Sequence, residues 1–135
     1  MKYKLDHIGI AVETLEQGKA FYEALGLSPM HVETVEKEKV KVGLFDLEND
    51  CRIELLEPLS KDSTIQKYLE KRGPGIHHIC LRVEGIRDML KTLKKGGVTL
   101  INEEPHMGAH NCLVAFIHPK STGGVLIELS EQQGK

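Results

Sequence analysis

The sequence predicts an α+β fold made of two repeated modules, each with the element order βαβββ. Two echoes within the chain predict it. Residues 6–13 are echoed 71 residues later by residues 77–84, and residues 52–57 are echoed 74 residues later by residues 126–131. A strand, a helix, a glycine stop and a closing strand recur in the same order, which is typical of an internal duplication.

The chain length of 135 residues suits one domain with one core, which we expect to span residues 1–135. The first module covers about residues 1–59 and the second about residues 75–131. A linking helix over about residues 62–72 joins them. Gly73-Pro74-Gly75 predicts the end of that helix, because glycine and proline do not continue it.

The first module begins with a strand over residues 4–12, where apolar residues alternate with small or polar ones. Thr14, with Gln17 three residues later, predicts a capping box that opens a helix, and Gly26 predicts its end. The expected inward stripe of that helix consists of Leu15, Gly18, Phe21, Tyr22 and Leu25. Three strand-like runs follow, near residues 28–36, 39–47 and 51–57.

The second module repeats this plan. Residues 76–84 predict a strand and residues 86–95 a helix, which Gly96-Gly97 ends. Strand-like runs follow near residues 98–103, 112–118 and 124–130. The offset between the copies grows from 71 to 74, so the second copy contains three extra residues, which we place in the loop from Pro105 to Asn111.

Composition excludes several classes of function. The net charge of −2, with both signs interspersed, lacks the basic surface that nucleic-acid binding needs, and no apolar stretch approaches the length of a membrane span. The start of the chain lacks the apolar segment of a signal peptide. The three cysteines lack Cys-x-x-Cys spacing, which favours reduced thiols and a cytoplasmic location.

Four polar residues occupy equivalent places in the two copies. They are His7 and Glu54 in the first and His78 and Glu128 in the second. Each lies on the face of its strand opposite the aliphatic row, because successive strand residues point to opposite faces. If the helices cover the aliphatic faces, all four side chains point into a cavity between the modules.

Two imidazoles and two carboxylates suit one divalent metal ion, with Co, Mn, Ni, Zn or Fe as candidates. The sequence therefore predicts curved sheets around a metal-containing cavity. An ion that prefers six ligands would keep about two positions for water or substrate, as catalysis requires. The alternatives are ordinary polar residues on the wet face of a sheet, or a coordinatively saturated structural site.

Two loops contain further candidates for contact with a substrate. His110 lies at the end of the run Pro105–His110, which either covers a substrate or is an ordinary solvated loop. Lys120 and Ser121 lie in a turn before the strand of Glu128. They could meet a substrate phosphate, and a plain hairpin loop is the alternative interpretation.

These residues resemble the vicinal oxygen chelate superfamily (glyoxalase/bleomycin resistance/dioxygenase proteins) over nearly the whole chain. Within it the motifs are most similar to those of methylmalonyl-CoA epimerases. The motifs are Asp6-His7-Ile8-Gly9-Ile10-Ala11-Val12, Glu54-Leu55-Leu56-Glu57-Pro58-Leu59, Gly75-Ile76-His77-His78-Ile79-Cys80, His118-Pro119-Lys120-Ser121 and Gly123-Gly124-Val125-Leu126-Ile127-Glu128-Leu129. The His-Pro-Lys-Ser motif is the most specific of them.

The resemblance implies a glyoxalase-like fold and an isomerase that interconverts the 2R and 2S epimers of methylmalonyl-CoA. Removal of the C2 proton would leave an enolate that the metal stabilises. The metal ligands would be His7, Glu54, His78 and Glu128, and Glu128 would also be the catalytic base. The substrate would be an acyl-CoA, and a homodimer is expected because exposed sheet edges need cover.

Two departures from the epimerase pattern leave alternatives open. Some epimerases have Gln where Glu54 stands, and Glu is typical of bacterial glyoxalase I, so lactoylglutathione lyase activity is one alternative. A non-catalytic small-molecule-binding protein of the same fold is another. Some epimerases also carry a second Glu near the position of Val42. Here a water, Lys41 or a residue from elsewhere would have to supply the second proton.

Overall fold

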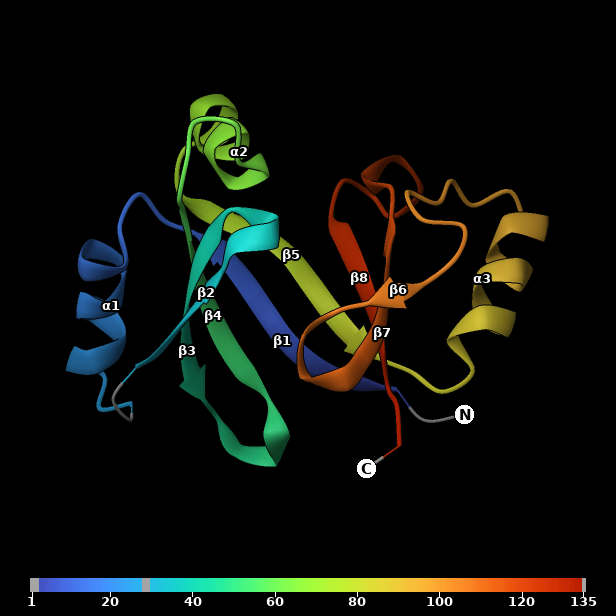
Figure 1. The fold of residues 1–135 in the computed structure, drawn as a ribbon, viewed down its shortest axis with the longest axis horizontal. Coiled ribbons are helices and arrows are strands. Elements are labelled where there is room, and N and C mark those ends of the chain that lie inside the picture. Colours follow the sequence, from blue (N-terminus) through green and yellow to red (C-terminus); the bar gives the residue numbers. More distant parts are fainter. Residues whose placement is uncertain (1–2, 28–29, 135) are drawn as a thin grey trace. The chain divides into compact units, whose positions relative to one another are not determined.

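The computed structural model describes residues 3–27 and 30–134, so the start of the predicted strand 28–36 lies outside the described residues. The chain forms two compact units, His7–His77 and His78–Lys135 with Met1–Asp6. The fold is α+β, as predicted, and the order βαβββ occurs twice along the chain (Figure 1).

The first copy consists of β1 (Lys4–Ala11), α1 (Leu15–Ala24), β2 (His31–Val35), β3 (Val40–Asp46) and β4 (Arg52–Pro58), followed by the linking helix α2 (Thr64–Arg72). Its strands lie in the order β2-β3-β4-β1. β1 pairs with β4 in parallel, whereas the β2–β3 and β3–β4 pairs are antiparallel. Short 3₁₀ turns, η1 (Glu36–Glu38) and η2 (Glu48–Asp50), connect the strands on either side of β3.

The second copy consists of β5 (Gly75–Arg82), α3 (Ile86–Lys95), β6 (His106–Met107), β7 (Cys112–Ile117) and β8 (Leu126–Gln132), with 3₁₀ turns η3 (Ala109–Asn111) and η4 (Pro119–Ser121). Its strands lie in the order β5-β8-β7-β6, again with the first strand parallel to the last. The duplication extends to the backbone. Val12 N donates to Leu56 O at 3.0 Å, and the equivalent Val83 N donates to Ser130 O at 2.9 Å.

Each helix buries an apolar stripe against the aliphatic face of its own sheet. Leu15 of α1 packs in a cluster with Leu55 and Phe45, which are both fully buried. In the second unit Ile86 and Leu90 of α3 pack in a cluster with Leu129 of β8. Burial of side chains of this size stabilises each helix–sheet contact by about 1.5–3 kcal/mol per side chain.

The predicted stripe of α1 is only partly correct. Leu15 is buried and Tyr22 packs beside Phe45, with ring centroids 5.4 Å apart. Phe21 and Leu25 were wrongly predicted to point inward, because their side chains are 65% and 64% exposed. Phe21 and Tyr22 are consecutive, so they lie about 100° apart around the helix and cannot both face one sheet.

The predicted strand over residues 98–103 is also wrong. Within the described residues only an isolated bridge forms there, between Leu100 and Ile117. The Asn102 side-chain oxygen accepts a hydrogen bond from Phe116 N at 2.8 Å and replaces a backbone partner, which interrupts a regular ladder. The short strand β6 forms instead, within the loop that was expected to hold the three extra residues.

None of the helices in the described ranges is long and apolar enough to cross a membrane.

Candidate functional site

The first unit contains the histidine–glutamate pair His7 and Glu54, on the parallel strands β1 and β4. His7 is 7% exposed, and its Nδ1 lies 3.5 Å from Glu54 Oε2. Ile53 and Leu55, on either side of Glu54, belong to the cluster under α1. Glu54 therefore lies on the face away from α1, as the alternation predicted.

Arg52 is a close neighbour of this pair that the sequence did not single out. Its Nη2 and Nε donate to Glu54 Oε2 at 3.0 and 3.2 Å. The two residues are two positions apart on β4, so their side chains share one face. An arginine two residues before a glutamate in a strand was the available signal. The guanidinium fixes the orientation of the carboxylate and partly neutralises its charge.

The second unit contains the equivalent pair, His78 on β5 and Glu128 on β8. His78 is 7% exposed, and its Nε2 lies 3.3 Å from Glu128 Oε1. The ring of Phe116, whose residue pairs with Glu128 across β7 and β8, packs edge-on against His78 with centroids 6.2 Å apart. Ile127 and Leu129 pack on the α3 side, so the predicted alternation also holds here.

The spacing within each pair fits metal ligands. Two ligand atoms that each lie about 2.1 Å from a shared ion, at an angle of about 90–110°, are about 3.0–3.4 Å apart. The pairs lie at 3.5 and 3.3 Å, from a nitrogen to an oxygen in both cases. Each unit therefore presents one buried imidazole and one carboxylate whose donor atoms have the chemistry and the spacing that a divalent ion accepts.

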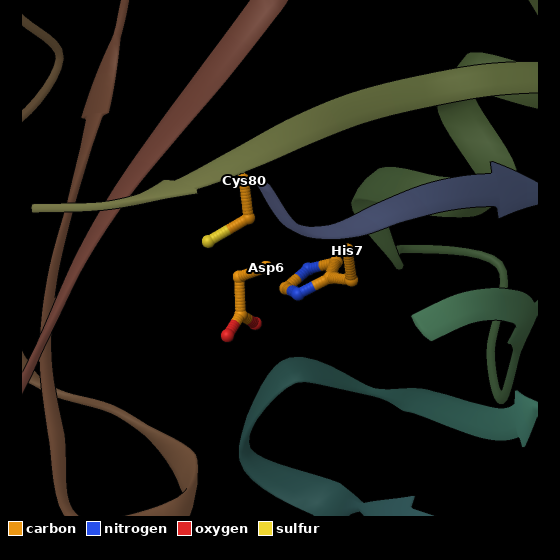
Figure 2. A group of neighbouring side chains, drawn as sticks. All are labelled: Asp6, His7 and Cys80. Atoms are coloured by element: carbon orange, nitrogen blue, oxygen red, sulfur yellow. The ribbon is translucent and has the colours of Figure 1, made fainter. Parts of the chain in front are cut away.

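A second polar group in the second unit surrounds Asp6 and Cys80, which come from β1 and β5 (Figure 2). Both are buried, and a carboxylate oxygen of Asp6 lies within 4.8 Å of the Cys80 sulfur. Arg82 forms an ion pair with Asp6. The sequence shows Asp6 directly before His7, but it does not show that an arginine 76 residues later neutralises this buried carboxylate.

The histidine next to His78 packs elsewhere, as expected from strand alternation. The ring of His77 contacts the ring of Tyr68 in α2 edge-on, with centroids 5.1 Å apart. Tyr68 also donates its hydroxyl to Ile76 O at 2.6 Å. His77 thus belongs to the packing of α2 on its strand.

The loop candidates lie in structured turns. His110 has a left-handed backbone with φ 58°, and the Gln132 side chain donates to its carbonyl at 3.1 Å. Ser121 Oγ accepts from Thr99 N at 2.9 Å, and Lys120 N donates to His118 Nδ1 at 3.0 Å. These bonds shape the turns. Substrate contact by His110, Lys120 or Ser121 stays a prediction.

Strand register removes one candidate for the second proton donor. Lys41 pairs with Glu57, whose carboxylate bonds to Leu15 N on the α1 side of the sheet. Val42 pairs with Leu56 and therefore shares the opposite face with Glu54. Lys41 points away from the His7–Glu54 pair, so its suggested role in proton delivery is wrong.

Comparison with known proteins places this chain in a family. A model of the glyoxalase/bleomycin resistance protein/dioxygenase superfamily matches residues 6–116. The mitochondrial methylmalonyl-CoA epimerase of Homo sapiens is 40% identical over 95% of this chain and 73% of its own length. The ethylmalonyl-CoA/methylmalonyl-CoA epimerase of Cereibacter sphaeroides is 40% identical over 95% of this chain and 97% of its own length.

Solved structures agree with these sequence relatives. The crystal structure of methylmalonyl-CoA epimerase from Mycobacterium tuberculosis has a TM-score of 0.85 and 39% identity, and the match covers 96% of this chain and 88% of that one. A hypothetical protein from Bacillus halodurans has a TM-score of 0.92 and 42% identity, covering 100% and 98% of the two chains. The chain belongs to the glyoxalase/bleomycin resistance protein/dioxygenase superfamily, in which its relatives include methylmalonyl-CoA epimerases.

Proposed function

We propose that this protein is an isomerase that interconverts the 2R and 2S epimers of methylmalonyl-CoA. The observation that carries the proposal is the 40% identity to named epimerases over 95% of the chain. A structure of methylmalonyl-CoA epimerase in complex with methylmalonyl-CoA, at 31% identity and a TM-score of 0.86, supports the same substrate. The repeated histidine–glutamate pairs provide the chemistry that such a reaction needs.

The proposed metal ligands are the members of both pairs, His7, Glu54, His78 and Glu128. The repeat in the sequence and the metal-compatible spacing within each pair support this assignment. Two histidines and two carboxylates suit Co, Mn, Ni, Zn or Fe as the ion. When bound, a divalent ion would polarise the carboxylate and thioester oxygens of a malonyl-type substrate and so acidify its C2 proton.

Glu128 is the proposed base that takes the C2 proton. It extends from β8 on the face away from α3, and its carboxylate lies 3.3 Å from His78 Nε2. The C–H bond electrons pass into the thioester carbonyl as an enolate, and the proton bonds to the Glu128 carboxylate. His78 keeps the orientation of this carboxylate, while the edge of Phe116 packs against the imidazole.

Isotope exchange tests the proposed function. Purified protein loaded with Co²⁺ should epimerise methylmalonyl-CoA and, in heavy water, incorporate deuterium at C2. Glu128→Ala should lower incorporation at least about 100-fold, which is the minimum contribution typical of a general base. The proposal fails if wild-type protein gives no more exchange than this variant. Turnover of methylglyoxal and glutathione instead would establish the lactoylglutathione lyase alternative.

We also propose a cytoplasmic homodimer. Cys51, Cys80 and Cys112 are free thiols, which suits a reducing compartment. The edge strand β2 exposes His31 to Thr34, and such an edge favours cover by a second chain. Light scattering at micromolar concentration should give twice the monomer mass, and the monomer mass would contradict the dimer.

A further inference from the structure

Inversion at C2 needs a second proton carrier besides Glu128, because the proton must leave from one face of the carbon and return to the other. Carriers that begin and end as the same chemical group are well suited to a reaction that runs in both directions. We therefore searched the face of the first unit that holds His7 and Glu54 for a second carboxylate. This inference rests on the proposed function.

The middle of that face is apolar. β3 contributes Val40, Val42 and Leu44, which are all less than 9% exposed and belong to one cluster with Leu56. Ile65 of α2 packs in the same cluster. A carboxylate in place of Val42 would be surrounded by these side chains, and burial of such a charge without a partner is costly. The inner strands therefore leave little room for a second acid near Val42.

The edge strand β2 places a carboxylate beside this position. Glu33 pairs directly with Val42, and paired residues of antiparallel strands share a face of the sheet. Val35, two residues further on β2, packs in the Val42 cluster, which shows that this alternate set of β2 side chains is on the Glu54 face. Glu33 is exposed, so its charge needs no burial.

Side-chain reach makes this neighbouring position useful. Adjacent strands are about 4.8 Å apart, so Glu33 lies one strand beyond Val42 and about two strands from the row of Leu56 on β4. A substrate that rests over Val42 would meet the carboxylate of Glu33 at one side. His31 shares the same face in the next row, where it pairs with Leu44, but it is an imidazole rather than a second carboxylate.

From this register we infer that Glu33 is the second catalytic acid–base residue of the epimerisation. In one direction Glu128 takes the C2 proton, the C–H electrons form the enolate, and protonated Glu33 gives its proton to the opposite face of C2. Its O–H bond breaks as the new C2–H bond forms. In the other direction Glu33 begins as the carboxylate and takes the proton, and protonated Glu128 returns one. Exchange with water then restores both groups.

A comparison of inversion with isotope exchange tests this assignment. Each pure epimer is incubated in heavy water with the metal-loaded protein, and epimer composition and C2 deuterium are measured separately. Glu33→Gln should invert at least about 100-fold more slowly than wild type. It should still exchange the C2 proton of one epimer with retention, within about threefold of the wild-type rate, because Glu128 continues to act on that face.

Matched variants give the controls. Glu36→Gln removes an exposed carboxylate from the turn after β2, and His31→Asn changes the neighbouring side chain on the Glu33 face. Both should invert at the wild-type rate. Wild-type inversion by Glu33→Gln, or parallel loss of inversion and exchange, would overturn the assignment. Loss of both reactions in wild-type protein would instead overturn the proposed function, so the two failures are distinguishable.

Discussion

The Glu57 carboxylate accepts a hydrogen bond from the backbone N–H of Leu15 at 2.7 Å, across 42 residues of sequence. The equivalent Glu131 accepts hydrogen bonds from Gly85 N at 2.7 Å and Ile86 N at 3.0 Å. The second glutamate of each repeated strand therefore binds the start of its module's helix, where backbone N–H groups lack partners and favour negative charge. The first glutamate, Glu54 or Glu128, faces the other side.

Removal of these remote caps should lower stability without removing metal ligands. We expect Glu131→Ala to lower the free energy of unfolding by about 1–3 kcal/mol, because two N–H groups lose a charged acceptor. Glu57→Ala should cost less, because it breaks one such bond and Thr14 Oγ1 still caps α1 at 3.1 Å from Gln17 N. Urea unfolding measures both. Glu84→Ala, an exposed control, should change little, and equal effects of all three would contradict the capping role.

Strand alternation explains why the candidate residues could be predicted from the sequence. His7, Glu54, His78 and Glu128 lie in strands with clear alternation, and a period of two assigns each side chain to a face. The start of α1 was also predictable, because Thr14 and Gln17 are three residues apart and their hydrogen bond is local. Local patterns of this kind do not depend on tertiary contacts.

Long-range contacts explain what the sequence did not show. α3 begins after Gly85, which has no side chain to cap it, and Glu131 does so from 46 residues away. The pairing of Glu33 with Val42 depends on the register of the β2–β3 hairpin. Asn102 accepts a hydrogen bond from Phe116 and ends the predicted strand there. Each depends on tertiary structure, which residue spacing alone does not specify.

Gly18 should tolerate no side chain. A Cβ at this position of α1 would lie 2.8 Å from Val12 Cγ1 and 3.2 Å from Leu55 Cδ1, both in the buried cluster. Overpacking of this kind typically costs about 1–3 kcal/mol, whereas a helical Gly→Ala change gains at most about 1 kcal/mol. Gly18→Ala should therefore lower the thermal midpoint. Lys19→Ala provides the control, and a higher midpoint for Gly18→Ala would contradict the close contact.

Arg52 should strengthen metal binding through Glu54. Its guanidinium donates two hydrogen bonds to Glu54 Oε2, and partners that orient a ligand typically contribute about 10–100-fold to metal affinity. Arg52→Gln should weaken Co²⁺ binding by about that factor in calorimetric titration. Arg87→Gln is the matched control, since Arg87 is exposed on α3. Tighter binding in Arg52→Gln would show instead that the guanidinium competes with the ion for the oxygen.

Asp62 should contribute a small, salt-sensitive pH dependence. A hydrogen bond from Lys39, with a second from Ser60, lowers the pKa of Asp62 to about 2 from its ordinary value of 3.8. The stabilisation is therefore present above about pH 4 and is lost as the pH falls towards 2. Asp62→Asn should flatten the fall of the thermal midpoint between these values. The difference should shrink in 1 M NaCl, because exposed pairs are screened, and a salt-independent difference would contradict this cause.

Metal binding should stabilise the folded protein through His78 but not through its neighbour His77. An ion that binds only the folded state adds about 2.7 kcal/mol at 100 times its dissociation constant, so Co²⁺ should raise the thermal midpoint of wild-type protein and chelation should reverse the rise. His78→Ala removes an imidazole that lies 3.3 Å from Glu128, and it should abolish the rise. His77→Ala removes only the ring contact with Tyr68. It should lower the midpoint of the metal-free protein and keep the full metal-dependent rise. An unchanged rise in His78→Ala would contradict the proposed ligand set, whatever the epimerase activity.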